Sequence, residues 1–201
     1  MDAAPTPPNG SPRAPRQVHL DSRQVRTLAH PLRMRLLGSL RVDGPATATA
    51  LAEKLGTNTG ATSYHLRQLA EVGLVAEDPD RGSGRQRWWQ AAHDISNFEP
   101  TDFDDDPDAR AAVQWIQGDQ VRLMADLAER WMGVEHHQSR EWRDAAGMGD
   151  LVLPLDPARL RALNDELWAV LMRYRDQPAP DGDVKPVHMF VAGFPRLEER
   201  W

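Results

Sequence analysis

Two short segments with helical spacing, separated by a glycine turn, constrain the fold more than any other feature of this sequence. The first predicted helix covers Ala50–Leu55, follows a cap at Thr47 or Thr49, and ends at Gly56. The second runs from about Gly60 to Val72, after a turn of only three residues. Because the connection is so short, the two helices must pack directly on each other as a helix-turn-helix.

The second helix has two different faces. Leu66 and Leu69 are spaced to point into a core, and Thr62 and His65 lean the same way because each precedes one of them by four residues. The outward-facing side chains are those of Ser63, Tyr64, Arg67 and Gln68. The outer face is therefore polar and carries hydrogen-bonding groups.

An apolar stripe upstream predicts further helix. Its residues are Val25, Leu28, Leu32, Leu36 and Leu40, in steps of three and four. Asp21 or Ser22 can cap the start, and Pro31 interrupts the pattern. We therefore expect a short helical turn followed by a helix that Pro31 opens at its first position.

Two short extended runs follow the second helix of the pair. They flank the connector Pro79–Gly84, which contains glycine, and so predict a β-hairpin. Alternation places Arg85 and Arg87 on one face and Trp88 on the other. Helices followed by an arginine-bearing hairpin make a winged helix-turn-helix.

The sequence predicts four regions. We expect a disordered tail over residues 1–17, a winged helix-turn-helix domain over 18–95, an acidic linker over 96–106, and a helical module over 107–201. The last region has a long helical pattern from Pro107 that could extend to Trp142, and two short strands at Leu151–Leu155 and Val187–Val191. The expected fold class is mainly α with a β wing, that is, α+β.

Charge divides the chain in the same way. From Arg13 to Ala92 there are 12 Arg and Lys against 7 Asp and Glu, a net charge of +5. From His93 to Trp201 there are 12 against 22, a net charge of −10. This asymmetry favours a polyanion as partner of the first half, although two solvated surfaces would give the same count.

Three segments together resemble the ArsR-like winged-helix transcriptional regulators. They are HPLRMRLLGSL (His30–Leu40), ALAEKLGTNTGATSYHLRQLAEVGLV (Ala50–Val75) and GRQRWW (Gly84–Trp89). The resemblance covers about Leu20 to Ala92 and is to a non-metal branch with an extended C-terminal region. It implies a homodimer that binds operator DNA and regulates a gene, with repression as the expected effect. The metal-sensing branch uses cysteines that this chain lacks altogether, so no metal or cofactor is expected.

In such a protein the second helix of the pair reads double-stranded DNA in the major groove. Arg67 and Gln68 match guanine and adenine edges, while the wing arginines contact the backbone or the minor groove. For His65, packing in the core competes with contact to a base. The complete set of predicted DNA-binding residues is Thr59, Ser63, Tyr64, His65, Arg67, Gln68, Arg81, Arg85 and Arg87.

The second half is the expected dimerisation module. Two-fold dimers read two half-sites, and the apolar stripe of Pro107–Trp142 is the natural seam, unless it packs within its own chain. A small apolar effector is a further expected partner, because this half is rich in tryptophan and methionine. These residues, which could equally form a core, are Trp115, Trp131, Trp142, Trp168 and Trp201 with Met124, Met132 and Met148.

Other classes of protein are less well supported. Glu135, His136, His137 and Glu141 have metal-ligand chemistry, but adjacent histidines on a helix point about 100° apart, and no catalytic motif is present. We therefore expect no enzyme activity. A winged helix that binds protein without DNA is the alternative function. The sequence contains no transmembrane run and no signal-peptide core, so we expect no membrane association and a cytoplasmic location.

Overall fold

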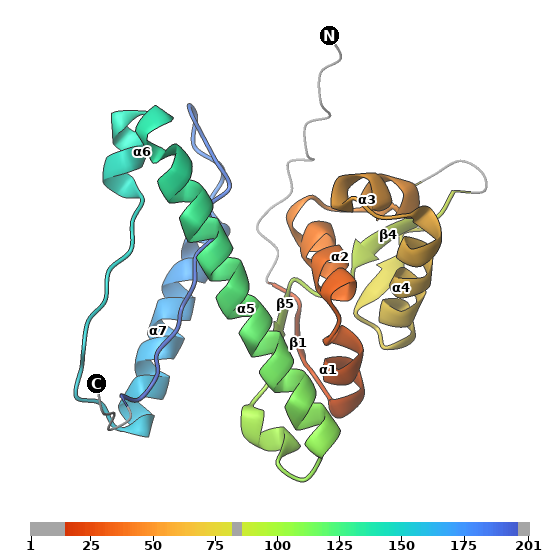
Figure 1. Ribbon diagram of the computed structural model, residues 1–201, viewed down its shortest axis with the longest axis horizontal. Coiled ribbons are helices and arrows are strands. Elements are labelled where there is room, and N and C mark those ends of the chain that lie inside the picture. Colours follow the sequence, from red (N-terminus) through yellow and green to blue (C-terminus); the bar gives the residue numbers. More distant parts are fainter. Residues whose placement is uncertain (1–14, 82–85, 197–201) are drawn as a thin grey trace. The chain divides into compact units, whose positions relative to one another are not determined.

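The computed structural model describes residues 15–81 and 86–196, which divide into two units, Pro15–Ala128 and a second unit beginning at Glu129 (Figure 1). The first unit contains, in order, β1 (Gln17–His19), α1 (Ser22–Leu28), α2 (Pro31–Val42), β2 (Ala46–Thr47), α3 (Ala48–Leu55), α4 (Thr59–Glu71), β3 (Val75–Glu77), β4 (Trp88–Ala91), β5 (Ile95–Asn97), η1 (Pro100–Phe103) and most of α5 (Pro107–Val134). The second contains η2 (Glu135–His137), α6 (Arg140–Ala145) and α7 (Pro157–Arg175). Many helices with a few short strands confirm the predicted α+β class.

Side chains that cap the backbone determine where the helices begin. Asp21 accepts a hydrogen bond from the Gln24 amide at 2.8 Å, and the Gln24 side chain accepts one from the Asp21 amide at 3.0 Å. Thr47 caps α3 by accepting from Ala50 N at 3.2 Å, and Gly56 ends that helix with a φ of +64°. Pro31 opens α2 as its first residue, as predicted.

The predicted hairpin is present and belongs to a larger sheet. Strands β3 and β4 pair antiparallel with Val75 opposite Ala91 and Glu77 opposite Trp89, and Trp89 is buried. Strand β2 joins the other side of β4, which gives the order β2-β4-β3. The sequence did not predict β2, because two residues are too few to show alternation.

A second, parallel pair of strands, also not predicted, joins β1 to β5. Gln17 lies opposite Ile95 and His19 opposite Asn97. Just before β1, the Arg16 amide donates to the Asp94 carboxylate at 2.7 Å. Residues 16 and 17, at the end of the expected tail, are thus paired within the first unit, and residues 1–14 lie outside the described part of the chain.

The core of the first unit extends beyond the helix-turn-helix. Apolar residues of α1 to α4, β3 and β4 share it with four residues of α5: Ala109, Ala112, Val113 and Ile116. Phe103 is also part of it, only 2% exposed, with its ring edge-on to Phe98 at 6.2 Å. The stretch 96–106, expected as a linker, is therefore partly packed, because an aromatic ring within an acidic run gains more from burial than from solvation.

The second unit differs from the sequence prediction in two respects. The expected strands at 151–155 and 187–191 are wrong: neither segment is in a strand. Pro154, within the first segment, lacks the amide hydrogen that a ladder needs, and Leu151 and Val187 remain exposed. The long helix ends at Val134 rather than continuing to Trp142.

Nothing in the described part of the second unit, residues 129–196, is buried. In the described ranges of the chain, no helix combines the length and apolarity needed to cross a membrane.

Replacing Phe103 by alanine should destabilise the first unit by about 3–5 kcal/mol, because it removes a fully buried ring from the core. Urea denaturation measures the loss. Phe194→Ala is the matched control, since that ring is 81% exposed, and should cost less than about 0.5 kcal/mol. Equal losses in the two variants would show that the segment around Phe103 is not part of the core.

Candidate nucleic-acid interface

The inner face of α4 determines what its outer face can do. Thr62, Leu66 and Leu69 are fully buried, at steps of four and three residues, and the helix packs against α2 and α3 (Figure 1). Asn58 begins α4 by accepting a hydrogen bond from Ala61 N at 2.8 Å. With one side fixed in the core, the opposite side of α4 is held rigidly toward solvent.

The outer face contains most of the predicted contact residues. Thr59, Ser63 and Arg67 follow one another in steps of four, so they lie along one line of the helix. Thr59 and Arg67 are exposed, as is Tyr64, which keeps 51% of its surface accessible. Ser63 and Gln68 are half-buried. Hydroxyl, phenol, guanidinium and amide groups are thus brought together on one surface.

Gln68 already has an internal partner. Its amide nitrogen donates to the Glu71 carboxylate at 3.1 Å, one turn further along α4. Such an exposed contact contributes little to stability, so Gln68 can exchange it for another acceptor at small cost.

His65 is placed differently from the other predicted residues. Its ring lies 4.4 Å from the ring of His30, and its Nδ1 is buried without a hydrogen-bond partner among the described residues. Burial, followed by the nearby His30 and Arg33, lowers the pKa of His65. Burial and Arg33 lower the pKa of His30 as well. His65 therefore lies on the packed side of α4, as a neutral ring.

His30 was missed by sequence reasoning. Its Nδ1 accepts a hydrogen bond from Leu32 N at 3.1 Å, so it is the N-cap of α2. The available signal was Pro31, because a proline at the first helical position makes the preceding residue the cap.

The wing arginines are paired with acids of the same hairpin. Arg87 contacts Glu77 at 2.9 Å, and Arg81 contacts Asp78 at 3.4 Å. Both guanidinium groups remain more than half exposed, so these pairs hold the arginines only weakly. Arg85 lies outside the described residues.

A family model described as "Helix-turn-helix domain" matches residues 28–78, which run from the end of α1 to just after β3. Over these residues the chain is therefore similar to the helix-turn-helix domains. The hairpin that directly follows α4 gives this helix-turn-helix domain its wing, so the predicted winged helix-turn-helix is confirmed. The match also agrees with the resemblance to ArsR-like regulators.

Solved structures that resemble the chain come from several regulators. The homodimeric winged helix-turn-helix DNA-binding domain of a possible ArsR-family regulator from Mycobacterium bovis is 24% identical over 52% of this chain and 77% of its own, with a TM-score of 0.33. A possible transcriptional regulator for arsenical resistance is 30% identical over 51% and 94%, with a TM-score of 0.31. ZitR from Lactococcus lactis, solved with DNA, is 15% identical over 78% and 77%, with a TM-score of 0.26.

A search of the curated proteins finds no match to this chain.

The residues considered as metal ligands lie on two elements. Glu135, His136 and His137 form η2, with the two imidazole rings 3.8 Å apart, and Glu141 lies on α6. In the described ranges, no three His, Asp or Glu side chains gather in a way that could hold a metal ion.

The His30–His65 pair should make the stability of the helix-turn-helix domain depend on pH. Both rings have a folded-state pKa below the ordinary value, so the unfolded chain binds more protons and stability falls as the pH drops below about 6.5. Urea denaturation at pH 7.5 and 5.5 measures this fall.

The control is the double variant His30→Asn and His65→Gln, in which the introduced asparagine side chain can still cap α2. It should lose less stability between the two pH values than the wild type. Some pH dependence will remain, because the pKa of His93 is also lowered, first by burial. An unchanged pH dependence would contradict the role of this pair.

Proposed function

We propose that this chain is a sequence-specific DNA-binding transcriptional regulator of the ArsR-like type, which acts as a homodimer and represses its target. One observation carries the proposal. The helix that follows the tight turn, α4, has its inner face fixed in the core and a polar line of Thr59, Ser63 and Arg67 on its outer face.

Recognition would take place in the major groove. Arg67 can donate two hydrogen bonds to a guanine edge, and Gln68, once released from Glu71, can pair with adenine. The hydroxyl groups of Thr59, Ser63 and Tyr64 suit phosphates or bases. Arg81 and Arg87 would leave their acidic partners for the backbone or the minor groove, and Arg85 would bind there as well.

Charge supports a nucleic acid as the partner. The stretch Arg13–Ala92 carries a net charge of +5, although the whole chain is acidic at −6. The excess lies in Arg13–Asn58, with eight Arg and Lys against three Asp and Glu, whereas Thr59–Ala92, which includes α4 and the wing, has four of each. Phosphates would therefore be attracted mainly by the residues before α4, among them the helices α2 and α3 that pack against it. The acidic remainder would weaken sequence-independent binding.

Homodimerisation is supported by apolar side chains that this chain does not cover. On α5, Leu123 and Val134, which are eleven residues apart and therefore share one face of the helix, are 42% and 46% exposed. On α7, Leu167 and Trp168 are 42% and 46% exposed. Exposed apolar side chains that share a helix face are typical of an interface. A second copy would cover it and place two α4 helices about 34–36 Å apart, for half-sites one helical turn apart.

The expected apolar effector stays a prediction. Of the tryptophans expected to line its site, Trp142 lines a pocket and Trp115 packs against the core of the first unit. Trp201 lies outside the described residues.

The alternative is a winged helix that binds protein and not DNA. The two functions differ in salt dependence and in sequence preference, because only a DNA reader distinguishes its operator from a scrambled duplex.

Fluorescence anisotropy with the DNA upstream of its own gene and a scrambled duplex tests the proposed function. The wild type should prefer the native duplex, and log affinity should fall against log salt with a slope of roughly −0.9 per phosphate contact. Arg67→Ala should weaken binding to the native duplex by about 1–3 kcal/mol, roughly 5- to 150-fold, and change binding to the scrambled duplex much less.

Arg159→Ala, on α7, is the control for a lost positive charge and should leave the preference unchanged. If Arg67→Ala weakened binding to both duplexes equally, the result would contradict a role of Arg67 in reading bases. No binding of either duplex by the wild type would instead favour the protein-interaction module.

Sedimentation velocity should find the wild type as a dimer at micromolar concentration. Leu123→Glu should shift it to monomer, because a carboxylate would be buried in the apolar seam. Gln114→Glu, at an exposed position nine residues before Leu123 and so on the opposite face of α5, should leave the dimer intact. A monomeric wild type, or a dimer unaffected by Leu123→Glu, would contradict dimerisation through α5.

A further inference from the structure

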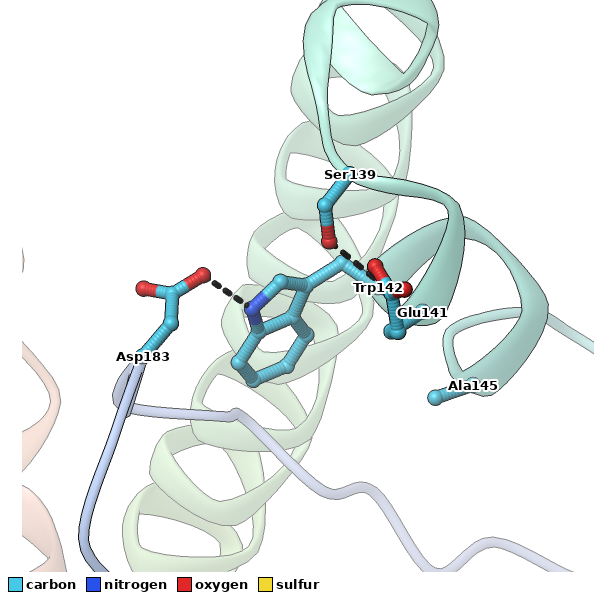
Figure 2. A pocket seen from close by; sticks show the side chains of 5 residues that line it. All are labelled: Ser139, Glu141, Trp142, Ala145 and Asp183. Atoms are coloured by element: carbon cyan, nitrogen blue, oxygen red, sulfur yellow. Dashed lines mark hydrogen bonds between the residues drawn. The ribbon is translucent and has the colours of Figure 1, made fainter.

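The second unit contains a pocket built around one indole ring. It has a volume of about 380 Å³ and is lined by Ser139, Glu141, Trp142, Ala145 and Asp183. Figure 2 shows the Trp142 ring between the α6 residues and Asp183, which comes from the segment after α7. The indole Nε1 donates to the Asp183 carboxylate at 2.7 Å, which fixes the ring plane. Its volume lies within the range of small-molecule sites.

A cation of the chain itself already lies on this ring. The Lys185 ammonium is 4.8 Å from the centroid of the Trp142 ring, within the range of a cation–π contact. The same Nζ lies 3.2 Å from Asp183 Oδ2 and 3.2 Å from Gln138 Oε1. An aromatic face, a carboxylate and an amide oxygen thus converge on one ammonium group.

Negative charge persists at this site across the physiological pH range. Hydrogen bonds from Lys185 and from the Trp142 indole lower the pKa of Asp183. The backbone amide of Glu141 and the Ser139 hydroxyl lower the pKa of Glu141. Glu141 forms no ion pair with any residue of the described ranges, so one carboxylate of the pocket keeps an uncompensated charge.

The other charged residues of α6, which are Arg140, Arg143 and Asp144, do not line the pocket. Arg140 is paired with Asp144, one turn along the same helix, at 3.3 Å. An anionic ligand would face two ionised carboxylates, whereas a cation would meet them together with the ring. A neutral apolar ligand would gain only the contact with the Trp142 ring.

We propose that this pocket binds a small organic cation, an ammonium group attached to a compact apolar body, over the Trp142 ring and between Glu141 and Asp183. Lys185 occupies the same recognition elements and acts as an internal competitor. Its side chain and that of Asp183 are 38% and 65% exposed, and exposed ion pairs and cation–π contacts are weak, so a ligand can displace the lysine readily.

Binding at this pocket does not depend on the proposed function, whereas any effect of the ligand on DNA binding rests on it. The test therefore contains no DNA. Failure to bind a cation would not argue against DNA recognition, and failure to bind DNA would not argue against a cation site in the pocket.

The probe is choline, and its neutral isostere 3,3-dimethyl-1-butanol is the matched control. The indole N–H signals of the full chain, labelled with nitrogen-15, are followed by NMR during titration. The chain has seven tryptophans, so the signal of Trp142 is assigned by its loss in Trp142→Phe. We expect choline to shift this signal saturably and the neutral isostere to leave it in place.

Lys185→Met removes the competitor and should tighten choline binding roughly two- to fivefold. Lys185→Arg keeps a cation on the ring and should bind like the wild type. Glu141→Gln should weaken binding. Circular dichroism confirms that each variant is folded. Equal shifts by choline and its isostere, no shift of the Trp142 signal, or unchanged affinity in Lys185→Met would each overturn the proposal.

Discussion

The burial of one face of α4 is the constraint on which the rest of the first unit depends. Leu66 and Leu69 are inaccessible to solvent, as is Thr62, so the helix can neither rotate nor slide without exposing apolar surface. The same packing fixes the direction of Thr59, Ser63 and Arg67. Core stability and the position of the outer polar line are therefore two results of one packing arrangement.

Local chemistry explains which elements were predictable. Asp21, Thr47 and Gly56 determine helix ends through their own hydrogen bonds or dihedral angles, so these boundaries are readable from sequence. The β1–β5 pair joins residues 78 apart, and Phe103 is buried by contacts with distant elements, which no local pattern reveals. The apolar runs at 151–155 and 187–191 suggested strands, but strands need a partner edge, and neither run has one in the described structure.

In the candidate site, too, local features were predictable from the sequence and contacts between distant residues were not. Helical periodicity predicted that Ser63, Tyr64, Arg67 and Gln68 face outward, because this depends only on spacing. It also predicted that His65 points inward, but the ring that lies against it, that of His30 at the start of α2, was missed. The internal partners of Gln68, Arg81 and Arg87 are likewise visible only in the structure. Apolar patterns in a sequence predict which residues are buried, but no described residue of 129–196 is buried, so the patterns of this region did not predict its structure.

The proposed placement of α4 in the DNA groove can be tested directly, because the chain has no cysteine of its own. A cysteine introduced by Glu71→Cys, at the end of α4 and outside the proposed contacts, can carry an iron–EDTA group that cleaves nearby DNA. On the operator duplex we predict two clusters of cuts about one helical turn apart, one for each α4 of the dimer. Glu166→Cys on α7 should give none of these cuts. Uniform cleavage from Glu71→Cys, or none at all, would contradict recognition of DNA by α4.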